Sequence, residues 1–131
     1  MDCPKCKNPL IALELEQIEI DHCTDCGGIW LDSGELELLF NDYNRAVEFI
    51  ESFSMSQDSG ERSIKCPICL KKMEKVSVPT EQTILIDRCI NDDGLWFDVG
   101  ELERTLRSGK LDPDNPVFYL LKEMFKNRME R

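Results

Sequence analysis

Two stretches of this sequence repeat each other, and together they decide the fold. The first is CPKC at residues 3–6 followed by IEIDHCTDCGGIWLDSGELE at 18–37. The second is CPIC at 66–69 followed by ILIDRCINDDGLWFDVGELE at 84–103. Eleven of the twenty positions in the longer segments are identical. A repeat of this kind indicates two copies of one small structural unit.

Between its two cysteine pairs, each copy alternates apolar and polar residues around a polar break. The apolar positions are Leu13, Leu15, Ile18 and Ile20 in the first copy, and Val76, Val78, Ile84 and Ile86 in the second. Alternation with a period of two around such a break predicts a β-hairpin with one buried face. The second copy is three residues longer at the break, where a hairpin tolerates a change in length.

The first copy has four cysteines at the spacing of a structural zinc site. Cys3 and Cys6 form one CxxC pair and Cys23 and Cys26 form the other, with sixteen residues between the pairs. Each tight turn can aim two sulfurs at one ion, so we expect these four cysteines to bind one Zn²⁺. A redox-active CxxC is the alternative, but it would open a helix within a βαβ unit, and no such pattern is present.

The second copy keeps three of the four cysteines. Cys66, Cys69 and Cys89 align with the first three ligands of the first copy, while Asp92 aligns with the fourth and Asp93 follows it. Three alternatives stay open for this second site. An aspartate carboxylate completes it, either Asp92 at the aligned position or Asp93 beside it; a water completes it as in catalytic zinc sites; or it holds no metal and the unit depends on packing.

Helix signals follow each second cysteine pair. Asp32 and Asp98 each precede a glutamate by three residues, which resembles a capping box and predicts a short helix. This role explains Glu35 and Glu101 without catalysis. Further along, Asn115-Pro116 resembles an N-cap and first position of a terminal helix. The apolar face of that helix would consist of Val117, Leu120, Leu121, Met124, Phe125 and Met129.

Three aromatic side chains near the metal ligands need an interpretation. We expect Trp30 and Trp96 in the core, between hairpin and helix, where they would shield the sulfurs from water. His22 precedes a metal ligand, but its counterpart in the second copy is Arg88, so the position does not require a ligand. We therefore expect His22 to be exposed to solvent.

The sequence thus predicts a small α+β fold made of tandem zinc ribbons. Each ribbon would comprise a zinc knuckle, a β-hairpin, a second knuckle and a short helix, and a C-terminal amphipathic helix would follow. The first ribbon with its helices would span 1–53, a polar linker 54–63, a degenerate second ribbon 64–110 and the terminal helix 111–131.

The string CPxC…CxxCGGIWLDxGELE resembles the transcription-factor-IIB-type zinc finger family. Both copies carry it, and they cover about two-thirds of the chain. The resemblance implies a zinc-ribbon fold with the four cysteines as ligands, and the family name implies a link to transcription. The second copy departs from the family pattern at Asp92 and Asp93.

The formal charge of −10 disfavours nucleic acid as a partner, because polyanions repel an acidic surface. We expect a non-enzymatic zinc-binding scaffold that contacts a protein partner, or a second copy of itself, through its C-terminal helix. Nucleic-acid binding is the first alternative, and it would use the basic side chains Lys65, Lys71, Lys72, Lys75 and Arg88. An enzyme with an open second zinc site is another, with Asp93 as its general base.

The sequence also gives an expectation for the compartment. It contains no run of 18 apolar residues, so we expect no membrane-spanning segment. Its first residues lack a basic region followed by an apolar stretch, so no signal peptide is expected. Closely spaced cysteines in odd number favour metal binding over disulfides, and we expect the cytoplasm.

Overall fold

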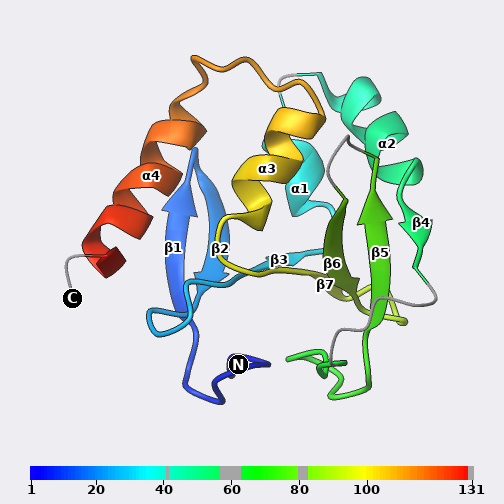
Figure 1. Cartoon of the computed structure of the whole chain (residues 1–131), viewed down its shortest axis with the longest axis vertical. Helices are drawn as coiled ribbons and strands as arrows, with labels where there is room; N and C mark the ends of the chain where they lie inside the picture. Colours follow the sequence, from blue (N-terminus) through cyan, green and yellow to red (C-terminus); the bar gives the residue numbers. More distant parts are fainter. Residues whose placement is uncertain (41, 57–62, 80–82, 130–131) are drawn as a thin grey trace.

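One antiparallel sheet joins the two copies of the repeat (Figure 1). The computed structural model describes the chain except residues 41, 57–62, 80–82 and 130–131. Within the described part, seven strands lie in the order β1-β2-β3-β7-β6-β5-β4. The strands are β1 (Ile11–Leu15), β2 (Ile18–His22), β3 (Ile29–Asp32), β4 (Ser54–Met55), β5 (Glu74–Val78), β6 (Ile84–Arg88) and β7 (Gly94–Phe97). The helices are α1 (Glu35–Leu38), α2 (Tyr43–Glu51), α3 (Glu101–Ser108) and α4 (Pro116–Met129).

Both predicted hairpins are confirmed, although Leu13 of the predicted buried face is exposed. β1 pairs with β2 and β5 pairs with β6, each over five residues. The first hairpin turns at Glu16 and Gln17, whose φ angles of 51° and 67° match the twist of the flanking strands. In the second hairpin the longer break includes residues 80–82, which lie outside the described part of the chain.

The two ribbons meet where β3 pairs with β7. Trp30 lies opposite Trp96, and Ile29 lies opposite Phe97. Because the two tryptophans are equivalent positions of the repeat, this pairing has approximate twofold symmetry, as the interface of a symmetric dimer has. At the far edge, Ser54–Met55 adds β4 to the sheet, so the predicted linker 54–63 begins with a strand. Its residues 57–62 lie outside the described part.

β3 and β7 separate two cores, because alternate residues of a strand point to opposite faces. Ile29, Leu31 and Phe97 are buried in a large apolar cluster together with residues of all four helices. Trp30 and Trp96 are fully buried on the other face, in a cluster that contains all seven cysteines. The prediction that both tryptophans are core residues is therefore confirmed, although they lie between the two ribbons.

Each short helix begins with only half of the predicted capping box. The Glu35 carboxylate accepts a hydrogen bond from the backbone N–H of Asp32 at 2.6 Å, as predicted. The expected cap by the aspartate is wrong, since the N-cap of α1 is Gly34, with φ at 90° and no side-chain cap. The carboxylate of Asp32 instead accepts from the indole N–H of Trp30 at 2.8 Å. The second ribbon repeats both contacts, at 2.9 and 3.1 Å.

The terminal helix α4 packs on the protein's own core. The Asn115 side-chain oxygen accepts from the backbone N–H of Val117 at 2.9 Å, which confirms the predicted N-cap. Val117 and Leu121 are completely buried, and Leu120 and Met124 pack against the same cluster. The side chains of Phe125 and Met129, from the predicted apolar face, lie outside the described part. In Figure 1, α4 is drawn on the side of the sheet that ends in β1, and α2 on the side that ends in β5 and β4.

Candidate metal centres

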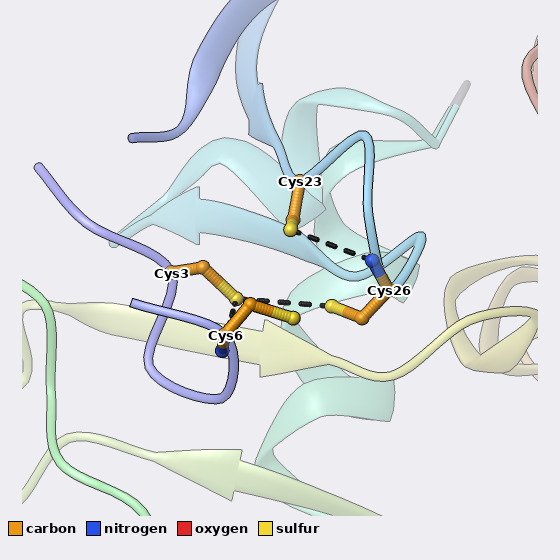
Figure 2. Close-up of side chains that lie close together, drawn as sticks. All are labelled: Cys3, Cys6, Cys23 and Cys26. Carbon is orange, nitrogen blue, oxygen red and sulfur yellow. Dashed lines mark hydrogen bonds between the residues drawn. The ribbon is translucent and has the colours of Figure 1, made fainter. Parts of the chain in front are cut away.

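The four cysteines of the first ribbon converge on one point (Figure 2). Their sulfurs all lie within 4.8 Å of one another, and those of Cys3 and Cys26 are 3.7 Å apart. Tetrahedral zinc with Zn–S bonds of about 2.3 Å separates its sulfurs by about 3.8 Å. The first site therefore fits Zn²⁺, with Cys3, Cys6, Cys23 and Cys26 as the ligands.

The knuckle backbone prepares these sulfurs for metal. The N–H groups of Lys5 and Cys6 both lie within hydrogen-bond distance of the Cys3 sulfur, at 3.4 and 3.3 Å. Lys7 closes the turn by donating to the Cys3 carbonyl at 2.9 Å, with a left-handed φ of 67°. N–H donors stabilise a thiolate, which is the form that binds zinc. The second ribbon repeats this arrangement at Cys66, where Ile68 donates at 3.4 Å.

In the second site the carboxylate that lies among the three sulfurs is that of Asp93, whereas the alignment places Asp92 at the fourth position. The Asp93 carboxylate oxygen lies 3.6 Å from the sulfur of Cys66 and 3.4 Å from that of Cys89. The sulfurs of Cys69 and Cys89 are 3.6 Å apart. Tetrahedral zinc places a thiolate sulfur and a carboxylate oxygen about 3.5 Å apart, so the group of three thiolates and Asp93 also fits Zn²⁺.

In the second ribbon the left-handed residue of the turn lies one position earlier, and this brings Asp93 rather than Asp92 to the sulfurs. In the first ribbon the left-handed residue is Gly27, which donates to the Cys23 carbonyl four residues back. In the second it is Asp92, with φ at 60°, which donates to the Cys89 carbonyl three residues back. Both turns close over the same total length, so the shift directs Asp93 to the sulfurs and leaves Asp92 exposed.

The two ribbons also hold each other's metal ligands in place. Lys5, inside the first knuckle, forms an ion pair with Asp98 of the second ribbon at 3.1 Å. Asp98 accepts at the same oxygen from the indole of Trp96, which packs among the cysteines.

His22, expected to be exposed, is buried, and its Nδ1 lies 3.3 Å from the carbonyl oxygen of Gly28. The expectation is wrong because β2 is an interior strand that pairs with β3 at this point.

Comparison with known families agrees with this geometry. The sequence model of the family described as transcription factor zinc-finger matches residues 2–42 and 65–108. These two segments cover more than half of the chain, and each contains one complete metal site. The chain belongs to this family. No curated protein and no solved structure matches it.

Membership and geometry together make this chain a zinc-binding protein with tandem zinc ribbons. The transcription factor zinc-finger segments end at residue 108, so α4 lies outside the matched region. Among the residues that the structure describes, no helix has the length and apolar character needed to cross a membrane.

Burial in this zinc-finger protein changes the pKa values of its cysteine thiols. Desolvation raises the pKa of Cys66 to about 12 and raises the pKa of Cys26 well above its ordinary value. A backbone N–H of Lys71 acts in the opposite direction and lowers the pKa of Cys69. A thiol with a raised pKa keeps its proton at neutral pH, so zinc has to displace protons from the metal-free protein.

Zinc binding is therefore expected to release protons from the thiols whose pKa is raised, in the first site of four cysteines and in the second site of three. Because protons compete with zinc for raised-pKa thiols, affinity falls as the pH falls, and more steeply at the four-thiolate site. Titration of zinc into weakly buffered, reduced protein with a pH indicator measures this release as zinc is added. Release that stops at one equivalent of zinc would mean that the second site takes up no zinc.

Proposed function

We propose that this zinc-ribbon protein is a non-enzymatic scaffold that binds another protein through the knuckles of its second ribbon. One observation carries the proposal: Ile68, Leu70 and Ile90 are 50%, 68% and 56% exposed at the tips of these knuckles. We call these three side chains the knuckle patch. Each of the three is adjacent to a metal ligand in the sequence, so the metal would hold them rigidly. Rigid exposed apolar groups favour a protein partner, since little entropy is lost on binding.

The first ribbon shows that the fold does not require apolar tips. The residues equivalent to the knuckle patch are Lys5, Lys7 and Thr24, all of them polar. Because the two ribbons have the same knuckle turns, the apolar side chains of the second ribbon serve no evident purpose in the fold. Their exposure costs solubility, and a partner that covers them would offset this cost.

Charge near the knuckle patch indicates the kind of partner. Lys71 and Lys72 follow the first knuckle and are exposed, and neither forms an ion pair within the described part of the chain. Two other members of the predicted basic cluster are paired within the ribbon, Lys75 with Asp87 at 2.7 Å and Arg88 through its own hairpin. An acidic segment with apolar side chains would complement this surface.

The ligand set of the second site supports a structural role over catalysis. Catalytic zinc sites keep an open position for water, whereas structural sites are filled by four protein ligands. Here three sulfurs and the Asp93 oxygen lie within 4.8 Å of one another, which is a complete set. All seven cysteines are free thiols, and we propose a reducing compartment, the cytoplasm, where thiols are kept available for zinc.

The same test also distinguishes two other candidate functions. Self-association through α4 is the first, although Val117 and Leu121 already bury part of its apolar face in the core. Nucleic-acid binding is the second, favoured by the exposed lysines and by the transcription link in the family's description. We consider both functions less well supported than protein binding at the knuckle patch, because neither would use the exposed apolar side chains of that patch.

The test converts the knuckle patch to the residues of the first ribbon. The variant Ile68→Lys/Leu70→Lys/Ile90→Thr should fold and keep its zinc, since the first ribbon carries the same residues on the same turns. Zinc-loaded wild type and variant are used as baits in nuclease-treated extract, and the captured protein is purified and titrated against each. We expect the variant to weaken binding at least about 30-fold, the effect of losing a hot spot of 2 kcal/mol.

Val99→Ser is the matched control, because Val99 is 46% exposed in the same ribbon and Ser33 is its counterpart in the first. It should leave the partner's affinity unchanged. A partner that binds the triple variant as tightly as wild type would contradict the proposal. If nucleic acid were the ligand, the two added lysines would instead strengthen binding.

A further inference from the structure

A pocket of about 600 Å³ lies between the two ribbons. Four lysines line it, Lys5 and Lys7 from the first knuckle and Lys65 and Lys75 from the second ribbon, together with Asp87 and Asp98. Its volume is in the range of sites for small organic molecules. The knuckle patch contributes no residue to it, so the pocket is separate from the proposed protein-binding surface.

Both carboxylates of the pocket are already matched by lysines. Lys75 forms an ion pair with Asp87 at 2.7 Å, with both side chains largely buried. Lys5 forms one with Asp98 at 3.1 Å. These two pairs are nearly neutral, and each lysine is held in place by its partner.

Lys7 and Lys65 carry the charge that remains. The ammonium group of Lys7 donates to the backbone carbonyl of Pro4 at 3.2 Å, which accepts a hydrogen bond but brings no negative charge. Lys65 forms no ion pair with any residue that the structure describes. Two ammonium groups from different ribbons therefore line one pocket, in a chain whose formal charge is −10. Two like charges facing one cavity favour a dianion between them.

We propose that this pocket binds a small organic phosphate, with its phosphate group between Lys7 and Lys65. A phosphate monoester is close to a dianion at neutral pH and offers several acceptor oxygens to ammonium donors. The lining also includes Pro4 and Ile64, which give the organic part of the ligand an apolar wall. A ligand of mononucleotide size matches this combination of volume, charge and apolar contact.

The zinc of the first ribbon is coupled to this pocket. Lys7 directly follows a metal ligand, and its left-handed backbone is fixed by the hydrogen bond to the Cys3 carbonyl. Removing the zinc should release the knuckle and with it two of the four lysines. Phosphate binding is therefore expected to depend on zinc, although no group of the ligand needs to touch the metal.

The test is calorimetric titration of the zinc-loaded full chain with adenosine monophosphate and, separately, with inorganic phosphate at fixed salt. We expect saturable binding of the nucleotide at one site per chain. Lys7→Gln and Lys65→Gln should each weaken it about 10-fold, and the double variant about 100-fold, as for loss of a hydrogen bond to a charged group. Both lysines are exposed, so fold and zinc content should be preserved.

A control outside the pocket makes the outcome decisive. Lys122→Gln removes an exposed lysine from α4 and should leave the affinity unchanged. The proposal is overturned if neither phosphate nor the nucleotide binds at millimolar concentration, or if Lys122→Gln weakens binding as much as Lys7→Gln. It is also overturned if only single-stranded DNA binds, with a steep salt dependence, since that would indicate a polyanion on the surface.

Discussion

Cys3→Ala is expected to cost one zinc ion per chain and to lower the melting temperature by more than about 10 °C. Cys3 is completely buried and belongs to the cluster that holds both tryptophans. Structural zinc contributes about 10–16 kcal/mol to small ribbons, as much as the whole stability of a typical domain. Elemental analysis measures the zinc loss, and thermal unfolding followed by circular dichroism measures the loss of stability.

The effect of Cys3→Ala should also spread to the second ribbon. Trp96 packs in the same cysteine cluster as Trp30, and the ion pair of Lys5 with Asp98 crosses between the ribbons. We therefore expect the near-ultraviolet signal of both tryptophans to change in one transition. Asp92→Asn, at an exposed position next to the other site, is the control and should change neither zinc content nor stability, because asparagine also tolerates the left-handed backbone at this position. Two bound zinc ions in Cys3→Ala, or an unchanged melting temperature, would contradict this account.

Gly94→Ala should destabilise the protein by about 3 kcal/mol or more, because there is no room for a methyl group at the junction of the ribbons. A Cβ atom at Gly94 would overlap the backbone carbonyl oxygen of Leu31 and the ring of Trp30. The carbonyl belongs to β3, which pairs with β7 here, so it can move only if the pairing of the ribbons is disturbed. Denaturant unfolding in excess zinc measures the change.

The matched control for Gly94→Ala is Gly100→Ala. Gly100 has a left-handed φ of 83°, but a Cβ there would meet no atom within 4 Å. Its substitution should cost about 1 kcal/mol, through backbone conformation alone. Equal costs at the two glycines would show that close packing at the β3–β7 junction is not what joins the ribbons.

Local chemistry explains why the first metal site and the hairpins could be predicted. The spacing of Cys3, Cys6, Cys23 and Cys26 is enough to place four sulfurs around one ion, because each knuckle is a short turn with few alternatives. Alternating apolar residues were likewise enough to place β1 with β2. Both features depend on neighbours in the sequence, and tertiary packing only completes them.

Other features depended on packing that the sequence does not display. The alignment placed Asp92 at the fourth ligand position, but a turn with its left-handed residue one position earlier brings Asp93 to the sulfurs. An aspartate tolerates the left-handed backbone region. The available signal was the missing glycine, since the first ribbon has Gly27 where the second has Asp93. The burial of His22 followed from the pairing of β2 with β3, which joins a hairpin to a knuckle.

The pairing of the two ribbons also could not be predicted from the sequence. The repeat predicted two similar units, but not that Trp30 would lie opposite Trp96 on adjacent strands. The signal lay in Gly28 and Gly94, since each leaves space for the tryptophan of the other ribbon. A glycine two residues before each tryptophan is consistent with close approach of another chain segment, although it does not identify that segment.

Zinc stoichiometry of wild type, Asp93→Ala and Asp92→Ala under chelator competition decides whether the second ribbon holds a metal through Asp93. We expect two zinc ions per chain in wild type and in Asp92→Ala. In Asp93→Ala we expect affinity at the second site reduced by at least about 10-fold, the loss known for groups that merely orient a ligand. One zinc ion per wild-type chain, or a loss caused by Asp92→Ala and not by Asp93→Ala, would contradict this expectation.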